Sequence, residues 1–212
     1  MIKVYHGTNL SSAFDISIHG IDLNKSLPHL DFGKGFYMGE SLEQPSTLIC
    51  NYPNSVIYTL ELDLTDISVK EIPLDLDWAL FVAFNRGKLT KEKSPELFKK
   101  YSEYKNNVDL FKGYIANDRM FVVMDRFFDG TITDKALIES LSALKLGIQY
   151  VAITQKACDK IKIVDNYKFS VEERNILIKK SEENRKQGIS LADDICRKFR
   201  REGKYFDELF YQ

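Results

Sequence analysis

The feature that most constrains this chain is the run Asp-Phe-Gly-Lys-Gly-Phe-Tyr-Met-Gly at residues 31–39. Glycine tolerates positive φ and allows close approach to the backbone, so Gly33 and Gly35 predict a tight turn. Phe36 to Met38 predict a short strand directly after that turn, with alternate side chains on opposite faces. One ring can then enter the core while the Tyr37 ring presents its face to a flat group. An ordinary glycine turn before a buried strand is the alternative interpretation.

A second run, Tyr-His-Gly-Thr at residues 5–8, ends the apolar N-terminal segment. It predicts a first strand that ends near His6 and a loop that begins at Gly7 and Thr8. A lone histidine beside an apolar strand is commonly a structural residue, which is the alternative here. The two runs together are more specific than either run alone.

Together these runs resemble the diphtheria-toxin-like and poly(ADP-ribose)-polymerase-like ADP-ribosyltransferases. The resemblance is strongest to a bacterial branch of unknown function in which Asp-Phe-Gly-Lys-Gly-Phe-Tyr is a hallmark. It implies an α+β fold, a split β-sandwich of two small antiparallel sheets with flanking helices and NAD⁺ in the cleft between them. We expect residues 1–166 to form this domain and residues 167–212 to form a helical C-terminal extension.

The resemblance also implies roles for individual residues. His6 would hydrogen-bond a ribose hydroxyl of NAD⁺, and the backbone of Gly7 would hold the nicotinamide amide. Tyr37 would stack on the nicotinamide ring, because an aromatic face attracts a cationic pyridinium. The NAD-binding residues expected from the two runs are therefore His6, Gly7, Thr8, Gly35, Phe36 and Tyr37.

A third signature residue is expected where Gln149-Tyr150-Val151 begins an apolar run after Gly147. In the transferases that this chain resembles, that residue is usually glutamate. The Gln149 amide can accept a hydrogen bond from a ribose 2′-hydroxyl, but it lacks the negative charge that favours an oxocarbenium-like transition state. A plain polar residue at a strand start is the alternative.

The polar triplet Asn117-Asp118-Arg119 interrupts an apolar segment that spans residues 114–124. Burying such groups without partners costs on the order of a few kcal/mol each, so they are expected to be capped, paired or at a cavity. One interpretation is a helix cap with Arg119 in a salt bridge. The other places Asp118 in the pocket, where it would restore the carboxylate that Gln149 lacks.

The resemblance implies a mono-ADP-ribosyltransferase that uses NAD⁺ as co-substrate and needs no metal. Polymer formation is not expected, since the family associates elongation with the glutamate, and Gly147 gives no support for arginine as the target residue. With a net charge of −1, the chain has no strong field to attract nucleic acid, so we expect a protein acceptor. Such an enzyme would fit a bacterial toxin or a defence effector.

Two other classes of function remain open. One is a non-catalytic module that binds NAD⁺ or ADP-ribose with the same fold, which Gln149 favours. The His6 and Tyr37 pair instead favours an enzyme, and an NAD glycohydrolase is the alternative enzyme with the same site. A structural or interaction protein that uses its C-terminal helices is the remaining class.

The three cysteines, Cys50, Cys158 and Cys196, are odd in number and lack metal-ligand spacing, which predicts reduced thiols in a cytoplasmic protein. No signal peptide is apparent, and no apolar run reaches the length of about 18 residues that a membrane helix needs.

The remaining pattern predicts helices alternating with strands. Ser11 or Ser12 caps a helix that stops at Gly20, and residues 41–44 have the form of a capping box. The clearest alternating strand covers residues 56–64, and residues 67–72 are expected to pair with it. Further helices are expected over 77–84, from Pro95 and over 133–144.

The composition changes at Phe169, after which Glu, Lys and Arg dominate. This tail predicts helices that break near Gln187-Gly188, with a last helix that begins at Ser190. We expect the tail to pack on the domain or to bind an antitoxin or other regulatory partner, an option that its terminal aromatic cluster favours.

Overall fold

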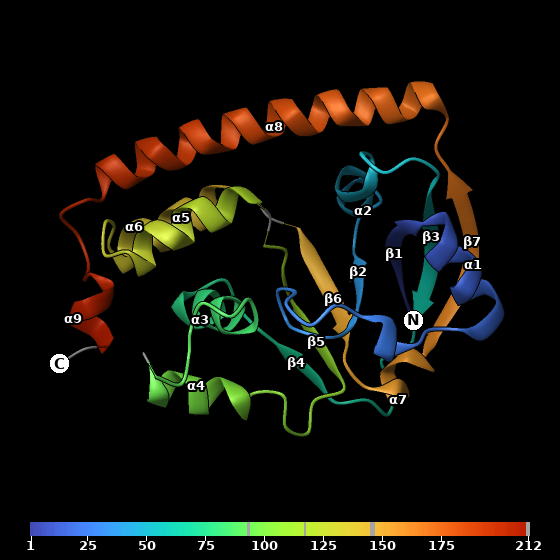
Figure 1. Ribbon diagram of the computed structural model, residues 1–212, viewed down its shortest axis with the longest axis horizontal. Helices are drawn as coiled ribbons and strands as arrows, with labels where there is room; N and C mark the ends of the chain where they lie inside the picture. The colour runs from blue at the N-terminus through green and yellow to red at the C-terminus, as the bar shows by residue number, and fades with distance from the viewer. Residues whose placement is uncertain (93, 117, 145–146, 211–212) are drawn as a thin grey trace.

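The computed structural model describes residues 1–92, 94–116, 118–144 and 147–210, without the side chains of Asp118, Arg119 and Arg185. The chain has the predicted α+β composition, with strands and helices interspersed along its length (Figure 1). The helices of the described residues are α1 (Leu10–His19), α2 (Glu43–Ile49), α3 (Leu76–Asn85), α4 (Pro95–Ser102), α5 (Asp118–Phe128), α6 (Asp134–Ala143), α7 (Gln155–Cys158), α8 (Val171–Lys198) and α9 (Phe206–Phe210), with a 3₁₀ turn at Leu23–Lys25.

The strands form one mixed sheet in the order β4-β5-β6-β2-β1-β3-β7. Among the described strands, β4 and β5 alone pair in parallel, and the other neighbouring pairs are antiparallel. The strand bounds are β1 (Ile2–Asn9), β2 (Phe36–Gly39), β3 (Ser55–Leu62), β4 (Val69–Glu71), β5 (Leu110–Tyr114), β6 (Ile148–Ala152) and β7 (Ile161–Lys168).

The structure joins the two small antiparallel sheets that we expected into this one sheet. The join is β2, which pairs with β6 over its whole length but meets β1 at a single residue pair, Tyr5 with Gly39. Beyond that pair the backbones of β1 and β2 part. The sheet therefore consists of two halves, β4-β5-β6-β2 and β1-β3-β7, that touch at one point.

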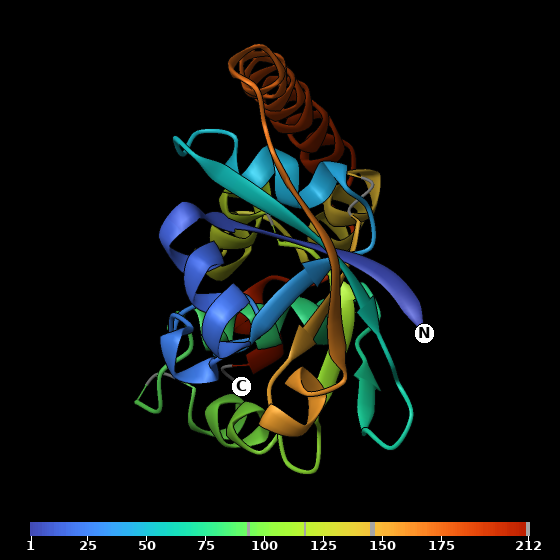
Figure 2. The same cartoon turned by 90° about the vertical axis from the view of Figure 1, so that its right-hand side faces the viewer.

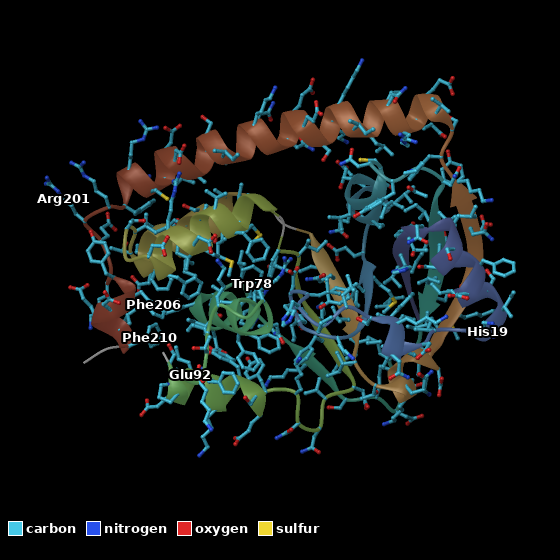
Figure 3. The ribbon with its side chains drawn as sticks, in the orientation of Figure 1. His19, Trp78, Glu92, Arg201, Phe206 and Phe210 are labelled. Carbon is cyan, nitrogen blue, oxygen red and sulfur yellow. The ribbon has the colours of Figure 1, made fainter. Side chains whose placement is uncertain are left out.

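The described residues form two apolar cores, and the strands β2, β5 and β6 contribute side chains to both of them. One core fills the space between the first half and the helices α3, α5 and α6, and includes the fully buried Trp78 (Figure 3). The other lies around β1 and β3 and includes Val4 and Tyr58. As predicted, Phe36 and Tyr37 face opposite ways, since Phe36 belongs to the second core and Tyr37 packs on the first.

The N-terminal helices correct two predicted caps. The side chain of Asn9, not of Ser11 or Ser12, caps α1, although the helix ends at Gly20 as predicted. Leu42 precedes α2 without a side-chain cap, and half of the predicted capping box is present because Ser41 N donates to Gln44 Oε1 at 3.1 Å.

The segment at residues 67–72 is also placed differently from our prediction. It contributes β4, which pairs in parallel with β5 at the far edge of the sheet and not with β3. Its short length and polar composition give no period that would choose between partners. The helices predicted over 77–84, from Pro95 and over 133–144 are confirmed as α3, α4 and α6.

The C-terminal segment contains one long helix where we predicted a break. The helix α8 continues through Gln187 and Gly188 and begins with a capping box at Ser170. An internal glycine costs about 1 kcal/mol relative to alanine, but packing of a helix against its neighbours easily exceeds that cost. Gly188 is buried, and α8 lies across α2, α5 and α6 (Figures 1 and 2). Among the described residues, no helix combines the length and apolarity needed to cross a membrane.

Candidate functional site

A cavity of about 480 Å³ opens where β1 and β2 part. That volume is typical of small-molecule sites. All of the residues expected from the two N-terminal runs line it, together with Gln149 from β6: His6, Gly7, Thr8, Gly35, Phe36 and Tyr37. Residues that lie more than a hundred positions apart in the sequence thus meet around one space.

His6 bridges the gap between the parted strands. Its Nδ1 lies 2.7 Å from the carbonyl oxygen of Tyr37, and its ring stacks on Phe36 with centroids 4.2 Å apart. A carbonyl oxygen only accepts hydrogen bonds, so Nδ1 carries the proton. Burial lowers the pKa of His6 to about 4, so the ring is neutral at neutral pH. Nε2 is then a hydrogen-bond acceptor.

Gly7 permits the close approach of α2 to β1. A Cβ atom at this position would lie 2.9 Å from Ile49 Cδ1 and 3.1 Å from the Pro45 carbonyl oxygen. Real Cβ atoms rarely come that close to another heavy atom, so a larger residue would displace α2 from the cavity wall. The glycine therefore shapes the cavity.

The Tyr37 hydroxyl closes the glycine turn. It donates to the carbonyl oxygen of Gly33 at 2.7 Å and accepts from Phe32 N at 2.9 Å. Gly33 has φ +77°, the left-handed conformation that the sequence predicted for this turn. Burial raises the pKa of the Tyr37 hydroxyl, which therefore stays protonated. The hydroxyl serves the turn, which leaves the ring as the group that Tyr37 offers to the cavity.

Gly35 and Ser26 fix the other side of the turn. Ser26 Oγ donates to the Gly35 carbonyl oxygen and accepts from Gly35 N, both at 2.9 Å. A Cβ atom on Gly35 would lie 2.5 Å from Val151 Cγ1. The glycine thus lets the turn sit directly against β6. Lys34, between the two glycines, is exposed.

Gln149 begins the strand pairing of β6 with β2, opposite Gly39, and only 5% of its surface is exposed. Its Nε2 donates to the carbonyl oxygen of Tyr114 at 3.0 Å. Gln149 thus lines the cavity at the position where the sequence placed the third signature residue. Asp118 is the first residue of α5, but its side chain lies outside the described residues, as does Asn117 entirely.

The cavity wall also contains an ion pair that was not predicted from the sequence. Asp31, 6% exposed, accepts from Arg86 Nε at 3.0 Å and from Arg86 Nη2 at 2.5 Å, and Ala116 N donates to its other oxygen at 3.1 Å. Arg86 also lies over the Phe121 ring, with the guanidinium carbon 4.1 Å from the centroid. Asp31 was visible as the first residue of the glycine-rich run, whereas Arg86 follows α3 with no local pattern to mark it.

The other charged residues that line the cavity are Asp15, Asp22 and Lys25, and the side chains of Lys25 and Asp15 pair at 2.7 Å and are exposed. Within the described part of the chain, no group of His, Cys, Asp and Glu side chains is arranged to hold a metal ion. The three cysteines are buried and unpaired.

Comparisons with known proteins identify the family of this chain. No curated protein and no solved structure matches the chain. A family model described as "Protein of unknown function (DUF3990)" matches residues 2–163, a span that contains every residue of the cavity described above. The chain therefore belongs to the DUF3990 family.

Proposed function

We propose that this protein is an NAD-dependent mono-ADP-ribosyltransferase of the diphtheria-toxin and poly(ADP-ribose)-polymerase type. The observation that carries the proposal is the convergence of His6, Gly7, Tyr37 and Gln149 on one cavity of ligand size. The sequence resemblance implied that these residues act on one dinucleotide, and their common position around the cavity supports that expectation.

The reaction breaks the bond between the ribose C1′ and the nicotinamide nitrogen. Nicotinamide leaves with the bonding electron pair, and an acceptor nucleophile forms the new bond to C1′ and releases its proton. A site of this kind accelerates the reaction by holding the dinucleotide bent and by binding the oxocarbenium-like transition state better than the substrate.

The local geometry fits the roles that this reaction requires. Neutral His6 offers Nε2 as an acceptor for a ribose hydroxyl, and the rigid turn holds the Tyr37 ring in the wall to stack on the nicotinamide ring. Gly7 lines the same cavity, and its backbone is the group that we propose to hold the nicotinamide amide. The resemblance to the split sandwich is supported by the parting of β1 and β2, since a cleft between sheet halves is where that fold would bind NAD⁺.

We also propose a cellular compartment, a class of acceptor and a partner surface for this transferase. The buried thiols are compatible with a reducing cytoplasm, and the acceptor is taken to be a protein because the net charge is −1. Arginine is not favoured as the modified residue, since Gln44 fills the space that a side chain at Gly147 would need.

The outer face of α8 is available for an antitoxin or other regulatory partner. A toxin or defence effector is the biological role proposed.

Gln149 favours one second candidate, a non-catalytic module that binds NAD⁺ or ADP-ribose. An amide supplies no negative charge to the transition state, so the residue fits binding better than it fits catalysis. The same cavity would serve an NAD glycohydrolase if water were the acceptor.

Transfer from adenylate-labelled NAD⁺ separates these activities. Purified protein is mixed with labelled NAD⁺ and a bacterial lysate, and label is measured in acid-insoluble material and in free ADP-ribose. A protein-directed transferase gives insoluble label that protease, but not nuclease, removes. A glycohydrolase gives free ADP-ribose alone. Neither product, with NAD⁺ still bound, identifies the binding module and overturns the transferase.

A further inference from the structure

We propose that Arg86 binds the pyrophosphate of NAD⁺ through Nη1 and the free N–H of Nη2. This inference rests on the proposed function, since it names a further binding residue of the same cavity. The pyrophosphate carries the negative charge of the dinucleotide, and the sequence motifs assign no residue to it. The charges and hydrogen bonds of the cavity wall point to Arg86.

The cavity wall is not positively charged as a whole. Its charged residues within the described part of the chain are three carboxylates and two cations, namely Asp15, Asp22, Asp31, Lys25 and Arg86. Two positive charges against three negative ones leave a formal balance of −1. The general field of the wall therefore does not attract an anion, and a pyrophosphate needs donors that contact its oxygens directly.

Lys25 is the weaker of the two candidate cations. Its side chain is 55% exposed and already pairs with Asp15, which is itself 41% exposed. A long exposed side chain loses rotamer freedom when it binds a ligand, and exposed ion pairs contribute little free energy. The Arg86 side chain, by contrast, is 32% exposed and is held in place without a ligand.

Asp31 and Phe121 fix the Arg86 guanidinium. Asp31 Oδ1 accepts from Nε at 3.0 Å and from Nη2 at 2.5 Å, and the Phe121 ring centroid lies 4.1 Å from Cζ. Asp31 is fixed in turn, because Ala116 N donates to its Oδ2 at 3.1 Å. Folding has thus already ordered this side chain, which lowers the entropy cost of binding a ligand there.

The guanidinium keeps free donors at its end. Asp31 takes one N–H on Nε and one on Nη2, which leaves the second N–H of Nη2 and both of Nη1. No described group accepts a hydrogen bond from Nη1. The described side-chain atoms that are buried without a partner are Trp78 Nε1 and Arg174 Nε, so Nη1 is accessible, on a residue that lines the cavity. Nη1 and Nη2 form a planar fork that matches two oxygens of a phosphate.

Asp31 balances the charge of Arg86 without occupying this fork. A partly buried guanidinium with no counter-ion would be costly in the cavity before a ligand binds. With Asp31 beside it, Arg86 is stable without ligand and still offers charged donors, whose hydrogen bonds to an ionised oxygen are stronger than neutral ones. The ion pair therefore suits a site that alternates between empty and occupied.

Calorimetric titration of the full-length protein with NAD⁺ and with ADP-ribose tests the assignment. Arg86→Gln is expected to raise Kd for both ligands about ten- to a hundredfold, because both contain the pyrophosphate. Lys25→Gln removes the other cation of the wall and is the matched control, with a change in Kd below about threefold. Arg86→Lys keeps the charge but loses the fork, so its Kd should lie between those of the wild type and Arg86→Gln.

The salt dependence of NAD⁺ binding separates a phosphate contact from support of the cavity wall. The wild-type Kd is expected to rise with salt concentration, and the slope should be smaller in Arg86→Gln because a contact between opposite charges is lost. A guanidinium that only holds the wall together would weaken binding without changing the slope.

A second pair of variants keeps the test decisive if Arg86→Gln does not fold with Asp31 left unpaired. Asp31→Asn is compared with the double variant Asp31→Asn, Arg86→Gln, in which no buried carboxylate lacks its partner. The double variant is expected to bind NAD⁺ and ADP-ribose at least about tenfold more weakly than Asp31→Asn.

Equal affinities of the wild type and Arg86→Gln for ADP-ribose would overturn the proposal. A loss confined to transfer onto a protein would place Arg86 at the acceptor, and an unchanged salt slope would assign it to the wall, so either result also overturns it. A wild type that binds neither NAD⁺ nor ADP-ribose would instead overturn the proposed function. A wild type that binds both ligands no more tightly than Arg86→Gln overturns the Arg86 assignment alone.

Discussion

His6 owes its proposed role to its protonation state. With Nδ1–H donated to the Tyr37 carbonyl oxygen, the neutral ring can only accept a hydrogen bond at Nε2. The pKa of about 4 keeps this arrangement intact through the physiological range. An ordinary surface histidine would lose it near its usual pKa of about 6.5.

The protonation state of His6 is expected to control how NAD⁺ affinity depends on pH. The affinity is expected to stay level from pH 8 to pH 5 and to fall as pH approaches 4, where His6 gains a proton and Nε2 ceases to accept. Calorimetric titration with NAD⁺ across this range measures it. An inflection near pH 6.5 that persists in His19→Ala and disappears in His6→Ala would contradict the account.

The same pKa predicts a change in protein stability. Between pH 6.5 and 4 the unfolded chain binds a proton at His6 that the folded chain does not. The free energy of unfolding therefore falls as pH is lowered through this window, by at most about 3 kcal/mol from this residue. Urea unfolding of wild type and His6→Gln at pH 7 and pH 4.5 isolates the contribution. An equal loss in both proteins would show that His6 has no part in it.

The Tyr37 side chain has two roles, because its hydroxyl stabilises the glycine turn and its ring is proposed to stack on nicotinamide. Tyr37→Phe removes the hydroxyl that joins Phe32 N to the Gly33 carbonyl oxygen, and is expected to lower the free energy of unfolding by about 1–2 kcal/mol. NAD⁺ affinity should change little, since the ring remains. Tyr37→Ala should weaken affinity roughly tenfold because stacking is lost. Equal affinity losses in the two variants would argue against stacking.

At the scale of elements, the single contact between β1 and β2 determines where the cavity forms. The glycine turn must sit against β6 so that β2 can pair with β6 and leave β1. Gly35 makes this packing possible. The cavity therefore lies where the pairing of β1 with β2 ends, and the segment over residues 20–31 also lines it.

Gly35→Ala tests that packing. The new Cβ would lie 2.5 Å from Val151 Cγ1 and 3.0 Å from the Ala152 carbonyl oxygen. We expect a loss of about 1–3 kcal/mol in the free energy of unfolding and weaker NAD⁺ binding. Gly87→Ala is the control, since that position has φ +78° and open space around it. The control should cost about 1 kcal/mol from backbone strain and leave NAD⁺ binding intact.

The sequence was informative where local patterns decide structure. The apolar periods of α3 and α6, the proline that begins α4 and the alternation of β3 identified these elements. The sequence was uninformative where packing between distant parts of the chain decides the structure. The partner of β4 and the continuity of α8 through Gly188 depend on surfaces formed elsewhere in the chain.

Some residues of the candidate site could be predicted from the sequence, and others could not. His6, Tyr37 and Gln149 could be chosen from short motifs, and they share the cavity. The Asp31–Arg86 pair joins residues 55 positions apart, and no spacing rule connects the glycine turn to the end of α3. The Tyr37 hydroxyl was also unpredictable, because its use depends on the exact path of the turn.

At the scale of the whole molecule, the C-terminal segment is part of the core. Ala192 and Cys196 from α8 and Phe206 from α9 are buried with the residues of α5 and α6. The Phe206 side chain is labelled in Figure 3. Its ring centroid lies 5.5 Å from that of Phe127 and 5.2 Å from that of Phe128. The helices that were expected as an extension thus stabilise the half of the sheet that carries Gln149.

Phe206→Ala tests this contribution. Loss of a buried aromatic ring is expected to lower the free energy of unfolding by about 3–4 kcal/mol. The neighbouring Tyr205, 38% exposed, provides the control, and Tyr205→Ala should cost less than about 1 kcal/mol. Chemical denaturation of both variants measures the difference. Similar small losses would indicate that the domain is stable without its C-terminal helices.

The central claim, that the cavity cleaves NAD⁺, is tested most directly by nicotinamide release from purified full-length protein. We predict that the wild type and His19→Ala, which changes an exposed histidine at the outer end of α1 (Figure 3), release nicotinamide at equal rates. His6→Ala should be slower by at least about tenfold, since it loses a hydrogen bond to the ribose at the reacting centre. A wild type that neither releases nicotinamide nor binds NAD⁺, or an undiminished rate in His6→Ala, would contradict the account.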